Sequence, residues 1–244
     1  MGNSTNHKKT TTTYQIERVT PQKLPWYGKR LIQEHLTRYQ FATPFVQDKI
    51  VVDIACGTGY GSKLLANAGA KQVIGIDNDQ QAIGIAEKKY QAKNLSYVIG
   101  DAEKLSLKTS SIDMIVSFET IEHFVYPQRF LHEIKRILKP DGMLILSTPN
   151  QALSYRDNPF HVKEYTYHEF QLMFSSFTQK HFYGQRPVYK PIVLLYKKLM
   201  TKTTNHLLRT FLRLRPWEPV NIHEIHKEKN TDYLYFICVG RNKK

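Results

Sequence analysis

Residues 50–61 read IVVDIACGTGYG, a short β-branched run that passes directly into a glycine-rich turn. β-Branched residues favour strands, and glycines let the chain turn tightly and let a ligand approach the backbone. The helix-forming residues 62–68 follow, and Gly69 is typical of a helix C-terminus. The stretch therefore predicts a strand, a loop and a helix whose N-terminus offers N–H groups and a positive dipole end to a ligand.

The alternation of strand and helix patterns continues beyond this unit. Further strands are expected at 72–76, 96–99, 112–118 and 143–147, and helices at 80–92 and 128–138, with a Lys-Pro-Asp-Gly turn at 139–142. Such alternation requires right-handed crossovers and a buried parallel sheet with helices on both faces. The fold class predicted is α/β, a three-layer αβα sandwich.

The segments that flank this core predict a tail, a covering helix and a last strand. Residues 1–13 are polar and threonine-rich, so we expect a flexible tail followed by a single domain over 14–244. Apolar residues at near-helical spacing predict an N-terminal covering helix over 29–46, with Pro44 near its end. An apolar run at 233–239 predicts the last strand of the domain, over 232–239.

A basic segment precedes that last strand. Residues 182–217 hold eight Lys or Arg and no Asp or Glu, interleaved with leucines and other apolar residues. The pattern predicts two short amphipathic helices within a basic helical insertion over 185–230. Such an insertion fits a lid over a ligand pocket, or a membrane-binding surface over 192–214 that rests on anionic lipid.

Composition limits the setting of the protein. The 35 Lys and Arg against 21 Asp and Glu give a net charge of +14, which favours anionic partners such as nucleic acid, phosphorylated small molecules or a membrane face. Two cysteines, Cys56 and Cys238, are too few for a disulfide framework, and no apolar run approaches the roughly 20 residues that span a bilayer. We expect a cytoplasmic protein, with peripheral contact at the inner membrane face as an alternative.

Two acidic residues sharpen the ligand expected at the glycine-rich loop. Asp53 precedes the loop, and Asp77 follows the next strand, 18 positions beyond Gly59. An acid at the end of the second strand is placed to accept hydrogen bonds from ribose hydroxyls. The loop is therefore expected to bind a nucleoside.

Several motifs in order resemble those of class I S-adenosylmethionine-dependent methyltransferases, whose Rossmann-like core begins with D-x-x-C/G-G-T/S-G. The matching stretches are Asp53–Gly59, Gly100–Leu105, Phe118–His123 and Leu138–Gly142, within roughly residues 48–150. The resemblance implies S-adenosyl-L-methionine as cofactor and S-adenosyl-L-homocysteine as product. It also implies a seven-stranded sheet whose last strand is antiparallel.

The resemblance also implies which residues bind the cofactor. Gly57 and Gly59, with Ala55 and Cys56 in the same loop, would line the methionine part of the cofactor, with Asp53 as a nearby acceptor. Asp77 and Asn78 would hold the ribose, and Asp101 and Ala102 would face the adenine. Ser117 would lie near the amino group of the methionine part, and Arg38 would pair with its carboxylate, beside Tyr39 as a pocket wall. Plainer alternatives are a capping role for Asp53, a turn role for Asp101 and a solvated Arg38. Cys56 is expected to pack beneath the loop, because methyl transfer needs no covalent enzyme intermediate.

Methyl transfer to a hydroxyl needs a group that removes a proton. His123 follows the fourth predicted strand, at the carboxyl edge where open α/β sheets bind ligands, and is the first candidate base. Glu119 and Glu122 flank it, and His161, within a proline- and asparagine-containing loop at 158–165, is an alternative base. Either histidine has a purely structural alternative. No metal is expected, because His223 and His226 form only an i, i+3 pair.

The acceptor is less constrained than the cofactor. The loop at 158–165 favours a small-molecule or glycan acceptor methylated on a hydroxyl, and a lipid-like phenol or quinone, or another lipid-linked acceptor, is the alternative. Nucleic acid is disfavoured, because neither an N/D-P-P-Y/F nor a Pro-Cys motif is present. A Rossmann oxidoreductase is disfavoured by the loop pattern, while a catalytically silent cofactor-binding module stays open. The oligomeric state is not predicted.

Overall fold

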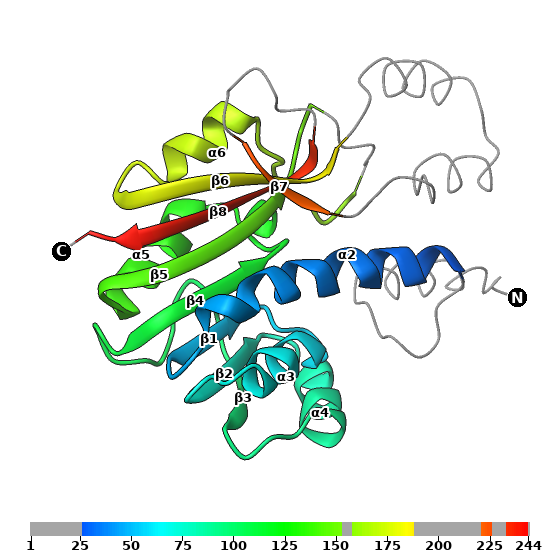
Figure 1. Cartoon of the computed structure of the whole chain (residues 1–244), viewed down its shortest axis with the longest axis vertical. Helices are drawn as coiled ribbons and strands as arrows, with labels where there is room; N and C mark the ends of the chain where they lie inside the picture. The colour runs from blue at the N-terminus through cyan, green and yellow to red at the C-terminus, as the bar shows by residue number, and fades with distance from the viewer. Residues whose placement is uncertain (1–25, 153–157, 188–220, 226–232, 244) are drawn as a thin grey trace, which may run out of the picture.

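One mixed sheet organises the part of the chain that the computed structural model describes, which is residues 26–152, 158–187, 221–225 and 233–243 (Figure 1). Its eight strands run in the order β3-β2-β1-β4-β5-β8-β6-β7. The strands are β1 (Ile50–Ile54), β2 (Gln72–Asp77), β3 (Leu95–Ile99), β4 (Ile112–Phe118), β5 (Leu138–Pro149), β6 (Phe177–Pro187), β7 (Ile222–Glu224) and β8 (Tyr233–Asn242). The helices are α2 (Trp26–Ala42), α3 (Tyr60–Asn67), α4 (Gln80–Lys89), α5 (Pro127–Ile137) and α6 (Tyr167–Met173), with 3-10 turns η1 (Thr43–Phe45) and η2 (Ile121–His123).

The first five strands of the sheet are parallel to their neighbours, and the remaining pairs are antiparallel. β1 lies between β2 and β4, and all three pairings from β3 to β4 are parallel, as is β4 with β5. β8 pairs antiparallel with both β5 and β6, and β7 pairs antiparallel with β6. The order of successive strands reverses at β1, with β2 and β3 on one side and β4 and β5 on the other, so the loops after β1 and β4 separate and leave a ligand crevice at the carboxyl edge.

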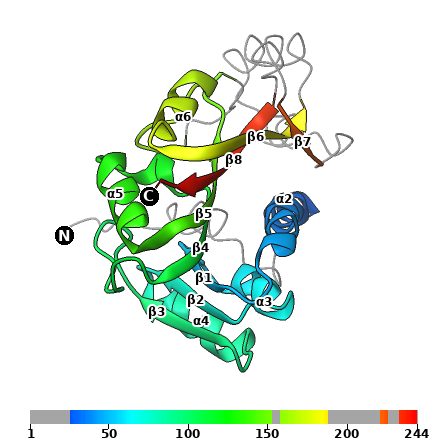
Figure 2. The ribbon, with the colours of Figure 1, turned by 60° about the vertical axis from the view of Figure 1, so that its left-hand side comes forward.

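Helices cover both faces of the sheet, as buried parallel strands require. α5 and α6 lie on one face, and α2 and α3 lie on the other (Figure 2). α5 begins at Pro127 and buries Phe130, Leu131, Ile134 and Ile137, a spacing that places all four on one side of the helix. They belong to one of two apolar cores, which also contains Phe170 of α6; the second core, under α2 and α3, joins Tyr39 and Leu65 to the other side of the strands.

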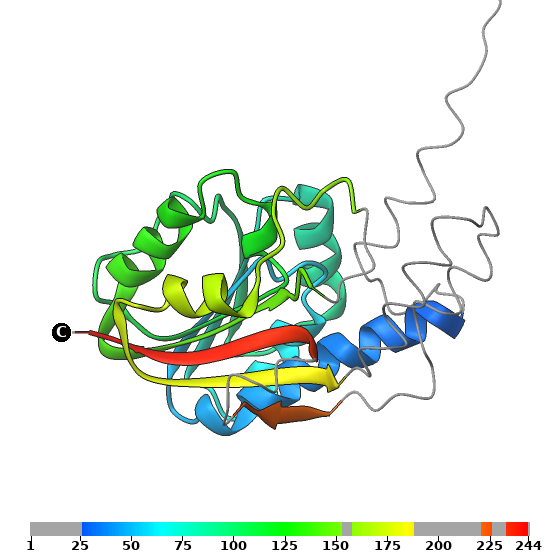
Figure 3. The same ribbon diagram turned by 90° about the horizontal axis from the view of Figure 1, so that it is seen from above.

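Helix α2 is bound to the antiparallel side of the sheet as well as to its centre. Figure 3 shows α2 running alongside β6 and β7. The ring of Phe41 lies 4.8 Å from the ring of Tyr183 on β6, in an edge-to-face arrangement. The side-chain amide of Gln185 donates to the carbonyl oxygen of Glu34 at 3.0 Å. These contacts fix α2 over the carboxyl end of β1 and β4, where the crevice opens.

The predicted fold class is confirmed, and most of the predicted elements are present. β1 forms from the β-branched run at 50–54 that predicts it, and β4 has the predicted bounds. The ends of α3, α4, α5, β2 and β3 differ from the prediction by a few residues. Among the described residues, no helix combines the length and hydropathy needed to cross a bilayer.

Four details of the prediction are wrong. The sheet has eight described strands and not seven, because β7 forms within the segment expected to be a helical insertion. The sequence did not predict the 11-residue strand β6 or the capped helix α6, because neither segment shows a clear period. The expected turn at 139–142 lies within β5, which bulges against β4 there. The covering helix spans Trp26–Ala42 and not 29–46, since η1 takes over before Pro44.

Two predictions concern residues that the structure does not describe, and a third concerns the last strand. The tail at 1–13 and the basic amphipathic segment at 192–214 lie outside the described residues. The expected last strand at 232–239 corresponds to β8, which is antiparallel as predicted and continues to Asn242.

Candidate active site

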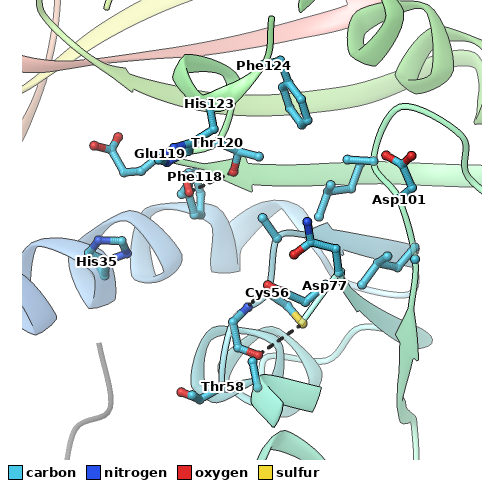
Figure 4. Close-up of a pocket in the computed structure, with 18 of the residues that line it drawn as sticks. His35, Cys56, Thr58, Asp77, Asp101, Phe118, Glu119, Thr120, His123 and Phe124 are labelled. Atoms are coloured by element: carbon cyan, nitrogen blue, oxygen red, sulfur yellow. Dashed lines mark hydrogen bonds between the residues drawn. The ribbon is translucent and has the colours of Figure 1, made fainter. Parts of the chain in front are cut away.

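A cavity of about 340 Å³ opens at the carboxyl edge of the parallel strands. Its walls come from the loops after β1, β2, β3 and β4, from α2 through His35 and Tyr39, and from Phe160. This volume is typical of sites that enclose a small ligand. Figure 4 shows Asp77 and Asp101 on one side of the cavity and Glu119 and His123 on the other.

The loop after β1 adopts backbone conformations that favour glycine. Ala55, Gly57 and Gly59 have φ values of 59°, 55° and 87°. A Cβ on Gly57 would meet no protein atom within 4 Å, whereas a Cβ on Gly59 would lie 2.6 Å from both the Ala86 Cβ and the Tyr97 hydroxyl oxygen. Gly59 is therefore required by packing, and Gly57, which lines the cavity, leaves room for a ligand to approach the backbone.

Asp77 lies at the end of β2 and lines the cavity. Its Oδ2 accepts a hydrogen bond from the Gly57 N–H at 2.8 Å, and its Oδ1 accepts one from the Asp79 N–H at 2.9 Å. The two bonds hold the carboxylate in one orientation and join it to the glycine-rich loop. A carboxylate fixed in this position can accept hydrogen bonds from a ribose.

Asp53 is buried behind the loop and does not line the cavity. The Ser62 hydroxyl donates to its Oδ2 at 2.6 Å, and the Tyr39 hydroxyl lies 3.1 and 3.2 Å from its two oxygens. Burial raises the pKa of Asp53 from 3.8 to about 7, although the hydrogen bonds from Ser62 and Tyr39 oppose this shift. Asp53 therefore connects β1, α3 and α2 beneath the site.

Arg38 is also buried and lies outside the lining of the cavity. Its Nη1 donates to the Gln185 Oε1 at 2.5 Å, and its guanidinium carbon lies 4.8 Å from the centre of the Tyr235 ring. Its Nε and Nη2 have no hydrogen-bond partner among the described residues. Buried donors left in this way are costly, so a ligand that accepts from them would be bound favourably.

Two buried hydroxyl groups, like the Arg38 guanidinium, have polar atoms without a hydrogen-bond partner among the described residues. The Oγ1 of Thr58 and the Oγ of Ser117 are buried without a hydrogen-bond partner in the part of the chain described. Thr58 lines the cavity, whereas Ser117 is inside β4 and does not reach the lining. Cys56 lines the cavity too, and burial raises the pKa of its thiol, so a thiolate nucleophile is disfavoured there.

The opposite wall follows β4. Glu119 has a φ of 54°, an uncommon conformation for a residue other than glycine, and its Oε1 accepts from the Ser147 hydroxyl at 2.7 Å. Strained backbone of this kind is concentrated at functional sites. The rings of Phe118, Phe124 and Phe160 line the same region and give it an apolar surface.

Two histidines meet beside this wall. The rings of His123 and His161 are 5.0 Å apart and nearly perpendicular. The His123 Nδ1 lies 2.9 Å from the Phe160 carbonyl oxygen, and the His161 Nδ1 lies 2.7 Å from the Glu164 Oε1. A carbonyl oxygen only accepts, so in neutral His123 the hydrogen is on Nδ1 and the lone pair is on Nε2.

The structure brings most of the predicted site residues to one cavity. The predicted residues that line it are Tyr39, Ala55, Cys56, Gly57, Asp77, Asn78, Asp101, Ala102, Glu119 and His123. Those that lie behind or beside it are Asp53, Gly59, Ser117, Arg38 and His161.

Sequence reasoning missed His35, Thr58, Thr120 and the three phenylalanines of the lining. The i, i+4 spacing of His35 and Tyr39 is the signal that places both on one side of α2. The phenylalanines carry no comparable signal, since aromatic residues are equally common in a core.

The comparisons with known proteins agree with this geometry. The methyltransferase domain family matches residues 52–146. A "probable S-adenosylmethionine-dependent methyltransferase" of Mycolicibacterium smegmatis is 32% identical over 159 residues, which are 59% of this chain and 61% of the relative. A "ubiquinone biosynthesis O-methyltransferase" of Coxiella burnetii is 34% identical over 108 residues, which are 43% of this chain and 46% of the relative. The chain spans less than two thirds of the length of these relatives.

The solved structures support the fold. The crystal structure of a SAM-dependent methyltransferase from Thermotoga maritima, described as a "possible histamine N-methyltransferase", superposes with a TM-score of 0.62 at 20% identity. The superposition covers 89% of this chain and 93% of that one. Residues 52–146 therefore match a class I methyltransferase domain, a family whose cofactor is S-adenosyl-L-methionine; the relatives carry the same description, and the solved structure shares the fold. The predicted family and cofactor are confirmed at this level.

Proposed function

We propose that this protein transfers a methyl group from S-adenosyl-L-methionine to a hydroxyl of a small-molecule or glycan acceptor. The observation that carries the proposal is that Asp77 and His123 line one cavity, because a carboxylate suited to a ribose and a candidate base are then close to the same bound ligand. The sulfonium of the cofactor supplies an activated methyl group, so the protein has to position the acceptor, exclude water and receive a proton.

The residues present suit this cofactor. Asp77 and Asn78 would hold the ribose, Asp101 and Ala102 would face the adenine, and the backbone at Ala55–Gly57 would adjoin the methionine part. We further propose that the buried Arg38 donates from Nε and Nη2 to the carboxylate of the methionine part, since these atoms have no partner among the described residues.

His123 is our candidate for the general base. Its Nδ1 donates to the Phe160 carbonyl oxygen, which fixes the ring, so in the neutral ring Nε2 is the nitrogen that would accept the proton of an acceptor hydroxyl. Glu119 lines the same wall and is a second proton acceptor. Phe118, Phe124 and Phe160 give this end of the cavity an apolar surface that excludes water.

A lipid-like phenol is the second candidate acceptor. The aromatic wall suits a ring, and Val125, Tyr126 and Val162, close in sequence to His123 and His161, are 65%, 57% and 55% exposed. The Coxiella burnetii relative is named for O-methylation in ubiquinone biosynthesis, which supports this class without assigning it. Membrane contact through residues 192–214 remains part of this second candidate.

Binding of the cofactor is the first measurement. Calorimetric titration with S-adenosyl-L-methionine and S-adenosyl-L-homocysteine should show micromolar binding to the wild-type chain. Asp77→Ala should weaken it at least tenfold, because the ribose loses its acceptor and the loop loses the bond to Gly57. Glu87→Ala, an exposed change on α4, is the matched control. Equal binding by wild type and Asp77→Ala would contradict the proposed cofactor site.

Transfer of labelled methyl then separates the acceptor classes. Sugar nucleotides, lipid-linked sugars, small metabolites and dihydroxyphenols would be offered with the labelled cofactor, and tRNA and DNA would be offered as nucleic-acid acceptors. Labelling of a sugar or metabolite hydroxyl supports the leading proposal, and labelling of a phenol supports the second. Cofactor binding without transfer to any of these would favour a catalytically silent module.

A further inference from the structure

Three potential metal ligands converge beside the cavity, where the sequence had predicted no metal. Ligand atoms of Glu122, His123 and His161 all lie within 4.8 Å of one another. Glu122 and His123 belong to η2, and His161 comes from the loop that precedes α6. The His223 and His226 pair, which by itself did not predict a metal site, takes no part here, and His226 lies outside the described residues.

Backbone hydrogen bonds hold the two segments together. The N–H groups of Val162 and Lys163 both donate to the Glu122 carbonyl oxygen, at 2.9 and 3.2 Å. His161 precedes these two residues, so the bonds fix its position relative to Glu122 and His123. The convergence is therefore built by the main chain and does not depend on side-chain rotamers alone.

The hydrogen bonds around the three side chains are compatible with metal binding. His123 and His161 each use Nδ1 in a contact with an acceptor, the Phe160 carbonyl oxygen and the Glu164 carboxylate. Metal-bound histidines almost always donate their other ring N–H in this way, which orients the ring and raises its basicity. The Glu122 side chain is fully buried, and its Oε2 accepts from the Thr148 hydroxyl at 3.2 Å.

We propose that Glu122, His123 and His161 bind one divalent transition-metal ion. Two imidazoles and one carboxylate are a donor set that suits Zn²⁺. Ligand atoms about 2.1 Å from a tetrahedral ion are about 3.4 Å apart, so modest side-chain rotation closes the site. Three protein ligands leave a fourth position, and since His123 lines the cavity, an acceptor oxygen can occupy it.

This inference rests on the proposed function and alters the proton acceptor. When the His123 Nε2 binds the metal it cannot also take a proton, so the acceptor hydroxyl, acidified by the metal, gives its proton to the Glu119 carboxylate. The acceptor oxygen forms its bond to the methyl carbon as the C–S bond breaks, and that electron pair stays on sulfur. Glu119 is suited to this part because it lines the cavity.

Zn²⁺ binding tests the site without any assay of methyl transfer. The full chain, freed of metal with a chelator, would be titrated with Zn²⁺ in competition with a zinc-binding dye. We expect one tight site, weakened at least a hundredfold in His161→Gln and Glu122→Gln. Glu164→Gln, which changes only the partner of His161, should weaken binding tenfold to a hundredfold. His132→Ala, an exposed histidine of α5, is the matched control and should bind as the wild type does.

Circular dichroism and cofactor binding show whether each variant is folded, and His161→Gln is available if the buried Glu122→Gln does not fold. Absence of a tight Zn²⁺ site, or equal affinity in wild type and His161→Gln, would overturn the proposal. If the wild type does not bind the cofactor, that result counts against the proposed function. Zn²⁺ binding at His161 would still be measurable in that case.

Discussion

The Tyr39 hydroxyl lies 3.1 and 3.2 Å from the two carboxylate oxygens of Asp53, which joins helix α2 to the central strand β1. Both residues are buried, and Tyr39 also lines the cavity while Asp53 does not. The third glycine of the loop region, Gly61, makes this contact possible, because a Cβ there would collide with the Tyr39 ring. The covering helix and the glycine-rich loop are thus parts of one packed unit.

Tyr39→Phe should therefore destabilise the protein. The change removes one donor from a buried carboxyl group and keeps the ring, so we expect a loss of about 1–2 kcal/mol in the free energy of unfolding. Urea denaturation measures the loss. Tyr126→Phe, at an exposed tyrosine, should change stability by less than about 0.5 kcal/mol. An unchanged midpoint for Tyr39→Phe would mean that Ser62 alone satisfies Asp53.

Asp53 should make stability depend on pH. Its folded-state pKa of about 7 is above the value of 3.8 expected when it is exposed, so the folded state binds the proton more tightly. The stabilisation from this group is complete below about pH 4 and is lost as the pH rises through 7. At about 1.4 kcal/mol per pKa unit, the shift corresponds to about 4 kcal/mol.

Asp53→Asn checks this sign, because the amide cannot ionise. The stability of the wild type relative to Asp53→Asn, measured by denaturation between pH 5 and pH 8, should fall as the pH rises. A constant difference across this range would show that Asp53 keeps one charge state throughout. Asp113→Asn is a useful comparison, because the pKa of Asp113 is lowered, and its carboxylate stays ionised over the same range.

Gly59→Ala should mainly lower the stability of the protein, whereas Gly57→Ala should mainly weaken cofactor binding. Gly59 has a φ of 87° and no space for a Cβ between Ala86 and Tyr97, so the alanine should cost several kcal/mol of stability. Gly57 has open space at its Cβ, so its alanine variant should lose only about 1 kcal/mol from backbone conformation.

Cofactor binding separates the two positions further. Gly57 lines the cavity, so Gly57→Ala should fold and yet bind S-adenosyl-L-methionine at least tenfold more weakly. Thermal unfolding and calorimetry on the same preparations give both quantities. Full affinity in Gly57→Ala would indicate that the ligand does not approach this part of the backbone.

Elements with a clear local sequence pattern are predictable from the sequence, whereas features that depend on long-range packing are not. β1, β4 and α5 are predicted well because continuous apolar runs and a clear helical period identify buried strands and an amphipathic helix. β7 has only three residues and takes its strand conformation from pairing with β6, which no local pattern records. Asp77 is predictable from its place after a strand, whereas the meeting of His161 with His123 depends on long-range packing between η2 and a distant loop.

Arg38 offers the last test, because its proposed ligand is one part of the cofactor only. If Nε and Nη2 donate to the methionine carboxylate, Arg38→Lys should weaken binding of S-adenosyl-L-homocysteine tenfold or more, since lysine cannot reproduce the fork geometry. Methylthioadenosine lacks the carboxylate, so its affinity should stay within about twofold of the wild-type value. Calorimetry with both ligands measures the contrast. Equal losses for the two ligands would mean that Arg38 acts by packing against Tyr235 and Gln185, and that the carboxylate is held elsewhere.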